Sequence, residues 1–428
     1  MNILILTNTF TPHVGGVARS VTAFTEEYRT RGHRVLVVAP EFPDMPKDEV
    51  DVVRIPAIQN FNASDFSVVL PIHPSLSDTL DAFRPDIVHA QHPFLLGMTA
   101  VRIARRRGLP LVFTHHTLYE RYTHYVPGDS PALKRFTIEL ATRYANLADQ
   151  VFAPSESIRD LLQQRGVVTP IAVVPTGVRL AHFAHGDGAA FRRQMGIPQD
   201  AFVVGHLGRL APEKNLEFLA RAVADFVGSQ PNAHFLVIGS GPAEAAMRGV
   251  FARASLEARL HVAGILQQQA LADALHAMDL FAFASTSETQ GMVLTEAMAA
   301  ALPVVALDAP GAREVVRDRH NGRLLNEATP EAFSAALQWV FALPSESLRE
   351  LKQVARDTAE AFSMPRSADK ALACYEALRS GAGAESGKDE SAWEEVMTAI
   401  RTEWDILKSV AGAGDAALGG GLFSERED

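Results

Sequence analysis

The chain has 428 residues, of which 47% are hydrophobic and 21% are charged, as in ordinary folded proteins. At about 100 to 200 residues per domain, this length excludes a single small module and favours two or three domains. The 40 Lys and Arg against 50 Asp and Glu give a net charge of −10, which argues against a nucleic-acid-binding protein. The single cysteine, Cys374, excludes an internal disulfide, so we expect a reducing, cytoplasmic location.

Short apolar runs alternate with longer helical patterns, which is typical of βαβ units around a parallel sheet. In the first half we predict strands at residues 3–7, 35–39, 86–90, 111–114, 151–153 and 171–174. The pattern then restarts, with predicted strands at residues 202–207, 234–238, 280–284 and 303–306. The sequence therefore predicts an α/β fold with two doubly wound, Rossmann-like domains over 1–180 and 181–365, closed by a helix over 366–380. Ligands of such sheets bind beyond the carboxyl ends of the strands, so we expect the chemistry in a cleft where the domains face each other.

A glycine-rich break at 381–384 precedes a predicted appendage over 384–428. Its apolar residues recur at spacings of three and four, which predicts an amphipathic helix. These residues are Trp393, Val396, Met397, Ile400, Trp404 and Leu407. Acidic residues outnumber basic ones there, so we expect the helix to dock on protein rather than on an anionic membrane. We predict that the end of the chain, after this helix, is disordered.

Two segments that directly follow predicted strands carry residues suited to binding a diphosphate. Gly15 and Gly16 stand between a strand and a helix, where a ligand can approach the backbone and free helix amides attract an anion. Arg209 and Lys214 follow the strand at 202–207 and supply two cations. A tight turn without a ligand and a solvated charged loop are the alternatives, and both stay open. The glycines do not form the dinucleotide fingerprint, which disfavours a dehydrogenase.

A third segment follows the predicted strand at 280–284. Gly291 begins a helix there, so the amides of Gly291, Met292 and Val293 form a candidate anion site. Glu288 lies in the loop before this helix and Glu296 lies within it. Two acids at this separation can contact different parts of one ligand. The alternative for Glu296 is an acid on the helix surface.

Two adjacent histidines, His115 and His116, end the strand at 111–114. Side chains alternate along an extended chain, so we expect one ring to face the ligand and the other to pack. A histidine here can exchange hydrogen bonds at neutral pH, or present its carbonyl to developing positive charge. No third ligand accompanies the pair at useful spacing, so we predict neither a metal site nor a cofactor.

Together these ordered motifs, with the glycine-rich segment 239–242, resemble retaining glycosyltransferases of family four, which have the GT-B fold and use nucleotide-diphosphate sugars. The resemblance covers roughly residues 1–380. The catalytic residues that it implies are His116 and Glu288. The donor-binding residues that it implies are Gly15, Gly16, Arg209, Lys214, Gly291, Met292, Val293 and Glu296.

The resemblance also implies what each side chain does. Arg209 and Lys214 would bind the donor diphosphate, Glu288 the sugar hydroxyls and Glu296 the ribose, while His116 would line the reaction centre. Retention of configuration is carried over from the family, and no metal is then required. The sequence offers no carboxylate that we can name as a nucleophile.

Three segments, at 90–97, 116–127 and 289–291, look most like diacylglycerol glucosyltransferases, which transfer glucose from UDP-glucose to a membrane lipid. The expected partners are therefore a UDP-sugar donor and a lipid acceptor at an anionic membrane surface, with no nucleic acid. No apolar run reaches the roughly 18 residues of a membrane span, so we expect peripheral binding, on the inner face of the cytoplasmic membrane.

Basic residues crowd two helical segments of the first half, and each can contribute about 1 kcal/mol near anionic headgroups. They are Arg102, Arg105, Arg106, Arg107, Lys134, Arg135 and Arg143. Ordinary solvated helix faces are the alternative. Three other functions stay open: a glycosyltransferase with a soluble sugar or small-molecule acceptor, a hydrolysing nucleotide-sugar epimerase of the same architecture, and a nucleotide-sugar-binding module without turnover.

Overall fold

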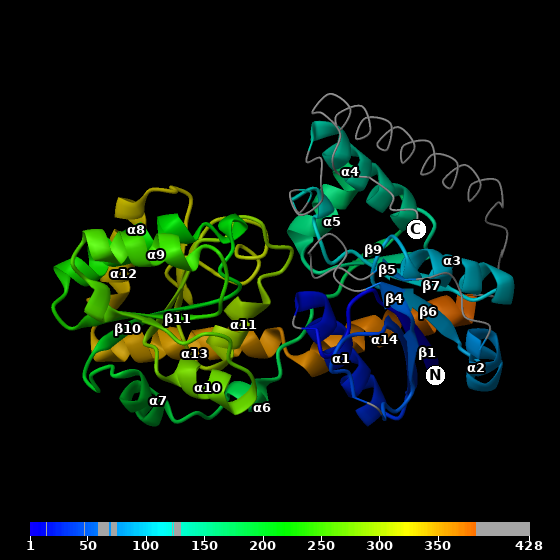
Figure 1. Ribbon diagram of the computed structural model, residues 1–428, viewed down its shortest axis with the longest axis horizontal. Helices are drawn as coiled ribbons and strands as arrows, with labels where there is room; N and C mark the ends of the chain where they lie inside the picture. The colour runs from blue at the N-terminus through cyan, green and yellow to red at the C-terminus, as the bar shows by residue number, and fades with distance from the viewer. Residues whose placement is uncertain are drawn as a thin grey trace, which may run out of the picture. The chain divides into compact units, whose positions relative to one another are not determined.

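The computed structural model describes residues 1–13, 15–46, 48–58, 68–69, 75–121, 123 and 130–381. The chain divides into two compact units (Figure 1). Among the described residues, the first contains those within 1–153 and 159–172 together with 372–381, and the second contains residues 154–158 and 173–371. The predicted appendage over 384–428 lies outside the described residues. So do residues 122 and 124–127 of the segment 116–127, which resembles diacylglycerol glucosyltransferases.

In the described part of the first unit, seven strands form a sheet in the order β3-β2-β1-β6-β7-β8-β9. The ladders from β3 to β8 are parallel. The strands are β1 (Asn2–Leu6), β2 (Arg34–Pro40), β3 (Val52–Ile55), β6 (Ile87–Ala90), β7 (Leu111–Thr114), β8 (Gln150–Ala153) and β9 (Ile171–Val173). Every residue of β6 and β7 is buried, which is why these strands are continuous apolar runs in the sequence.

Helices and short elements connect these strands. The helices are α1 (Gly16–Thr30), α2 (Ser75–Phe83), α3 (Leu96–Arg107), the 3-10 turn η2 (Tyr119–Arg121), α4 (Pro131–Ala145) and α5 (Glu156–Gln164). A small antiparallel pair is formed by β4 (Ala57–Ile58) and β5 (Val68–Val69). Helix α3 packs against β6, β1 and β7, and α1 packs against β2.

In the second unit, six strands form a sheet in the order β12-β11-β10-β13-β14-β15, and all of its ladders are parallel. The strands are β10 (Phe202–Leu207), β11 (Ala233–Ile238), β12 (Leu260–Val262), β13 (Leu280–Phe283), β14 (Val304–Leu307) and β15 (Gly322–Leu325). Alternate side chains of β11 enter two separate hydrophobic cores. Phe235 and Val237 belong to the first core, and Leu236 and Ile238 belong to the second. This sheet is therefore buried on both faces, as a doubly wound fold requires.

Different helices cover the two faces of this sheet (Figure 1). The first core contains residues of α8 (Leu216–Ser229), α9 (Glu244–Arg253) and α12 (Pro330–Phe341). The second core contains residues of α7 (Gly188–Met195), α10 (Gln268–His276), α11 (Met292–Ala299) and α13 (Ser345–Ala361). The remaining elements are α6 (Leu180–Phe183), the 3-10 turns η4 (Pro212–Lys214) and η5 (Glu257–Arg259), and α14 (Met364–Gly381).

All ten predicted strands are present, and the prediction of two doubly wound α/β halves is confirmed. The strands that the sequence did not predict are β3, β4, β5, β12 and β15. Three of these, β3, β12 and β15, lie at sheet edges, where the burial that produces a long apolar run is incomplete.

Helix α14 spans the predicted closing helix, and its later part belongs to the first unit. There the fully buried Tyr375 hydroxyl lies 2.6 Å from Nδ1 of His89 and accepts a 3.4 Å hydrogen bond from Tyr28. His89 Nε2 lies 2.6 Å from the Thr114 hydroxyl, and the Tyr375 ring stacks on Phe152. Tyr375 thus links the end of the described chain to α1, β6 and β8.

In the part of the chain that the structure describes, no helix combines the length and the apolar character needed to cross a membrane.

Candidate functional site

The strand order of the second sheet reverses between β10 and β13, which lie side by side. Loop 208–215 leaves the carboxyl end of β10, and loop 284–291 leaves the carboxyl end of β13. Open α/β sheets bind ligands where the strand order reverses. The loops that carry Arg209, Lys214 and Glu288 therefore begin at the expected ligand position of this unit.

Contacts between side chains and backbone hold these two loops together. Lys214 Nζ donates to Glu288 Oε1 over 2.5 Å, and the two side chains are only 16% and 18% exposed. Ser287 Oγ donates to the carbonyl of Glu213 over 3.1 Å, and Asn215 Nδ2 donates to the carbonyl of Ala284 over 3.3 Å. For Lys214 the alternative of a solvated surface loop is wrong, because the ammonium group lies in a partly buried ion pair.

Arg209 has a more open environment than Lys214. Its guanidinium group pairs with the carboxylate of Glu213, which lies four residues later. The Arg209 side chain is 47% exposed, whereas that of Glu213 is 9% exposed. The loop after β10 thus places one exposed and one partly buried cation within six residues of each other.

The glycines of segment 239–242 allow another loop to pack directly against loop 208–215. A Cβ at Gly239 would lie 1.9 Å from the carbonyl oxygen of Gly208, and one at Gly241 would lie 2.4 Å from that of Leu210. Both glycines have positive φ, at 135° and 149°. The amide of Leu210 also donates to the carbonyl of Ser240 over 2.9 Å. These glycines therefore shape loop 208–215 through backbone packing.

Helix α11 begins at Met292, directly after Gly291, whose φ of 70° lies in the left-handed region. The first amides of this helix, those of Met292 and Val293, lie at the terminus whose dipole favours an anion. Gly311 fits against the preceding loop, since a Cβ there would lie 2.8 Å from Cβ of Glu288. No local pattern singles out Gly311, because its partner Glu288 is more than twenty residues away in the chain.

Gln290 holds loop 284–291 in place through hydrogen bonds to the backbone of Thr176. Its Oε1 accepts from the Thr176 amide over 2.7 Å, and its Nε2 donates to the Thr176 carbonyl over 2.6 Å. Both residues are buried. A side-chain amide that satisfies both backbone groups of one distant residue holds the loop in a single position, which keeps Glu288 and Gly291 in place.

Glu296 lies on α11 and is only 4% exposed. The alternative of an acid on the helix surface is therefore wrong. A carboxylate this deeply buried requires polar or cationic partners to offset its desolvation.

His206 is a polar residue near the site that sequence reasoning missed. It lies in β10 and is buried, and its Nδ1 lies 3.1 Å from the Ala282 carbonyl, which places the ring proton on Nδ1. In the described part of the chain its Nε2 has no hydrogen-bond partner. Burial lowers the pKa of His206 to about 4, and the nearby Lys214 also lowers it while Glu288 raises it. No motif singles out a histidine within a buried strand.

In the first sheet, the strand order reverses between β1 and β6. Gly15 caps helix α1. In the described part of the chain, no heavy atom other than those of the adjacent residues and of the helix backbone lies within 4 Å of the place where a Cβ at Gly16 would stand. This is open space in front of a helix N-terminus, as close approach by a ligand requires. Nearby, Asn8 Nδ2 donates to the Phe94 carbonyl over 3.0 Å, which joins the loops after β1 and β6.

The two adjacent histidines have different environments, as expected from alternation along the chain. His115 is fully buried, and its ring lies edge-on to Phe113 and Tyr119. His116 is half-buried, and its Nε2 lies 2.6 Å from Gln91 Oε1. Desolvation lowers the pKa of His116 to about 4, so the imidazole is neutral at pH 7. Of the two histidines, only His116 is partly exposed.

The structure thus brings most of the predicted residues together within the second unit. These are Arg209, Lys214, Glu288, Gly291, Met292, Val293 and Glu296. Gly15, Gly16 and His116 lie in the first unit, each after a strand of that sheet.

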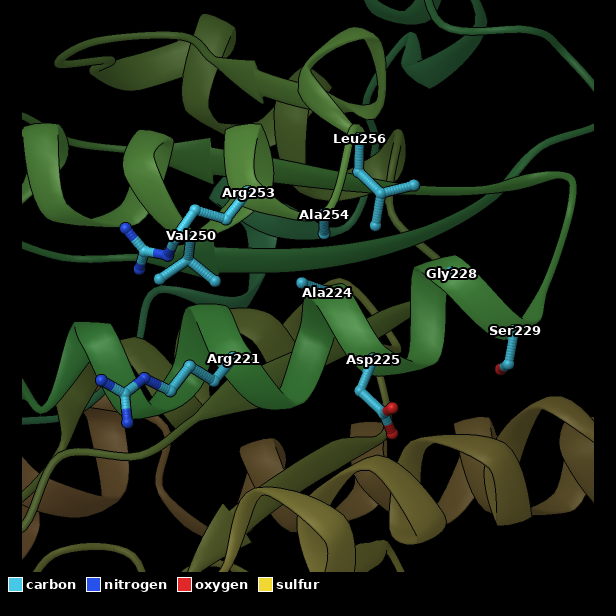
Figure 2. A pocket seen from close by; sticks show the side chains of 9 residues that line it. All are labelled: Arg221, Ala224, Asp225, Gly228, Ser229, Val250, Arg253, Ala254 and Leu256. Atoms are coloured by element: carbon cyan, nitrogen blue, oxygen red, sulfur yellow. The ribbon is translucent and has the colours of Figure 1, made fainter.

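A surface pocket lies between α8 and α9 and is lined by none of these residues (Figure 2). Its lining combines two arginines with small and apolar side chains: Arg221, Ala224, Asp225, Gly228, Ser229, Val250, Arg253, Ala254 and Leu256. None of them is a predicted site residue, and Arg221 already pairs with Glu217 on its own helix.

Comparison with known families agrees with this distribution of residues. Residues 14–182 match the family described as Glycosyltransferase Family 4, and residues 187–358 match the family described as Glycosyl transferases group 1. The chain belongs to glycosyltransferase family 4. It is therefore a glycosyltransferase, and the loops described above are its candidate site.

Three relatives of this glycosyltransferase have different names. Alpha-monoglucosyldiacylglycerol synthase of Streptococcus pneumoniae is 28% identical over 76% of this chain and 75% of its own length. GDP-mannose-dependent alpha-mannosyltransferase of Mycolicibacterium smegmatis is 30% identical over 88% and 98%. D-inositol 3-phosphate glycosyltransferase of Segniliparus rotundus is 34% identical over 71% and 68%.

Solved structures show the same fold. Anabaena HepE in complex with UDP and glucose aligns over 88% of this glycosyltransferase and 99% of its own chain, with a TM-score of 0.69 and 22% identity. The two parallel, doubly wound sheets and this likeness identify the GT-B fold, so that part of the sequence prediction is confirmed.

Proposed function

We propose that the enzyme transfers a hexose, glucose, from a UDP-sugar to a lipid acceptor such as diacylglycerol, with retention of configuration and without a metal ion. The observation that carries the donor half of this proposal is the Lys214–Glu288 pair at the point where the strand order reverses. The glucosyldiacylglycerol synthase relative supports the acceptor half. In this proposal residues 181–365 bind the donor and residues 1–180 bind the acceptor.

The Lys214–Glu288 pair lets one side chain serve two partners. An ammonium group has three N–H donors, so Lys214 can hold Glu288 and a phosphate oxygen at the same time. Negative charge grows on the diphosphate as the glycosidic bond breaks. Arg209, Lys214 and the amides at the start of α11 therefore stabilise the transition state more than the ground state. Glu288, oriented by Lys214, accepts hydrogen bonds from sugar hydroxyls, and Glu296 binds the ribose.

The acceptor hydroxyl attacks the anomeric carbon from the side of the leaving diphosphate. The new glycosidic bond forms as the bond to phosphate breaks, and a donor phosphate oxygen takes the hydroxyl proton. His116 lines this reaction centre as a neutral imidazole, so it adds no positive charge beside the developing cationic sugar.

For the membrane contact we propose the exposed basic residues Arg106, Lys134 and Arg135, which can bind anionic headgroups. Part of the wider basic cluster is neutralised locally. Arg107 pairs with Asp81 over 2.7 Å, and Arg143 pairs with Glu139 over 2.6 Å. The surface charge is therefore smaller than the sequence indicates.

A second candidate donor is GDP-mannose, because the mannosyltransferase relative aligns over nearly its whole length. A soluble acceptor is the corresponding alternative on the acceptor side, supported by the inositol phosphate relative. In both alternatives the donor diphosphate would bind the same two loops, 208–215 and 284–291, and the same charged side chains. An epimerase or a binding module without turnover would bind the donor without transferring sugar to any acceptor.

The test is a transfer assay that crosses UDP-glucose and GDP-mannose with diacylglycerol in anionic vesicles and with soluble sugars, alongside flotation with the same vesicles. We expect glucosylated lipid from UDP-glucose alone and flotation that increases with anionic lipid. The variant Arg106→Glu/Lys134→Glu/Arg135→Glu should lose flotation, whereas Arg193→Glu, an exposed change in the second unit, should not. Transfer only to soluble acceptors, without flotation, would overturn the lipid assignment.

Replacing Glu288 by alanine should reduce turnover about 100-fold while changing UDP affinity less than about threefold, because its proposed partner is the sugar. The control is Glu217→Ala, which removes an exposed acid that also pairs with a cation, Arg221. Steady-state rates and calorimetry with UDP measure the two effects. Equal losses of UDP affinity and turnover would make Glu288 a structural residue.

A further inference from the structure

Gln91 is a buried polar residue in the first unit to which neither the sequence motifs nor the proposed function give a role. It directly follows β6, and His116 follows the neighbouring β7 two residues after its end. The register pairs Ala90 with Phe113, so the parallel strands bring both residues to the same edge of the sheet. Gln91 is 4% exposed, and its Oε1 lies 2.6 Å from Nε2 of His116.

The backbone around Gln91 is held firmly. Its amide donates to the Leu6 carbonyl over 3.0 Å, which ties it to β1. The neighbouring His92 accepts the Asn8 amide at Nδ1 over 3.1 Å. Asn8 Oδ1 in turn accepts from the Leu96 amide over 3.1 Å. Hydrogen bonds therefore join the backbone at Gln91 to the end of β1. The strand order of the first sheet reverses between β1 and β6.

A neutral imidazole carries one N–H, and an acceptor oxygen at one nitrogen places the proton there. With Gln91 Oε1 at hydrogen-bond distance, the proton of His116 resides on Nε2, and Nδ1 becomes the nitrogen that accepts. An accepting Nδ1 can receive a hydrogen bond from a hydroxyl, the group that both a sugar donor and the proposed acceptor carry. The other tautomer, with the proton on Nδ1, would instead present a hydrogen-bond donor to that hydroxyl.

We infer that Gln91 is a positioning residue that fixes the tautomer and the ring orientation of His116 for sugar transfer, a role that rests on the proposed function. It contacts His116 rather than the reacting atoms, and it acts through the ring. Removing its oxygen lets the imidazole rotate and populate both tautomers.

The decisive measurement is ring nitrogen NMR of His116, assigned with His116→Ala, in the full chain and in Gln91→Met. Methionine matches the length and volume of glutamine but offers no comparable acceptor. We expect the Nε2–H tautomer in the full chain, a mixture of tautomers in Gln91→Met, and recovery of the Nε2–H tautomer at pH 8 in Gln91→Glu. The exposed Gln163→Met is the matched control. Unfolding midpoints confirm that each variant folds.

Kinetics supply the second measurement. Gln91→Met should lower kcat about tenfold or more and leave KM for the donor within about twofold, because positioning acts at the reaction centre. An unchanged tautomer and an unchanged kcat in Gln91→Met would overturn the inference and leave the proposed function standing. Absence of transfer by the unmodified enzyme with every donor and acceptor would overturn the proposed function, while the NMR result would still decide whether Gln91 sets the tautomer.

Discussion

Replacing Arg209 and Lys214 together by alanine should weaken UDP binding about 100-fold or more. In the proposed function, each change removes a charge-assisted hydrogen bond to the diphosphate, worth about 1.5 to 3 kcal/mol. Lys214→Ala also leaves the partly buried Glu288 carboxylate without its ion pair, directly beside the incoming phosphates. That repulsion adds to the loss, so Lys214→Ala should weaken binding more than Arg209→Ala. Calorimetric titration with UDP, with and without a chelator, measures the affinities.

Two further variants test this assignment. Lys214→Ala/Glu288→Gln removes the repulsion and should recover part of the affinity that Lys214→Ala loses. Arg356→Ala/Lys370→Ala removes the same charge from exposed helix positions of the second unit and should bind UDP normally. Undiminished affinity in Arg209→Ala/Lys214→Ala would show that the diphosphate binds elsewhere.

Mild acid should strongly destabilise the first unit. Burial lowers the pKa of His89, His92 and His115 to about 3, and that of His116 to about 4, against about 6.5 in an unfolded chain. Below pH 6.5 the unfolded chain therefore binds protons that the folded chain does not, and stability falls until the folded pKa values are reached. Each histidine contributes about 1.4 kcal/mol per pH unit. At pH 6.5 only half of the unfolded histidines are protonated, so the four together remove on the order of 6 kcal/mol between pH 6.5 and 5, a large part of the stability of a typical domain.

Urea unfolding at pH 7.5, 6.5 and 5.5 measures this slope. His115 offers a clean variant, because its ring nitrogens have no hydrogen-bond partner in the described structure and its ring packs against Phe113 and Tyr119. His115→Phe should reduce the slope by about one proton and stabilise the protein in acid. His320→Phe changes an exposed ring and should leave the slope as it is. A slope that His115→Phe does not alter would contradict the buried-histidine explanation.

The sequence was most informative where burial is complete. β1, β6, β11 and β13 are apolar over nearly their whole lengths because both sheet faces are covered, so their pattern can be recognised without a structure. Edge strand β15 has the sequence GRLL and is buried only at its two ends. A glycine and an arginine in four residues do not distinguish such a strand from a loop.

In the candidate site, too, only features with a local sequence pattern could be predicted. Arg209, Lys214 and Glu288 were predictable because charged residues directly after a buried strand are conspicuous. Gln91 and Gln290 lie in the segments 90–97 and 289–291, but their contacts were not predictable, because each partner is far away in the sequence: His116 for Gln91 and Thr176 for Gln290. A glutamine gives no local pattern that announces such a contact, and only the register of the sheets and the path of the loops bring the two residues together.

Tyr375 has a consequence for the order in which the chain folds during synthesis. It fills the space beside Tyr28, His89 and Phe152 in the first unit, yet it is translated about 200 residues after the last other described segment of that unit. Synthesis proceeds at about 5 to 20 residues per second, so Tyr375 is added on the order of 10 to 40 s after the preceding segments of the first unit. During that time His89 lacks its tyrosine partner and the aromatic face is open to water. The packing of the first unit around these aromatic rings is therefore complete only after helix α14 has emerged from the ribosome.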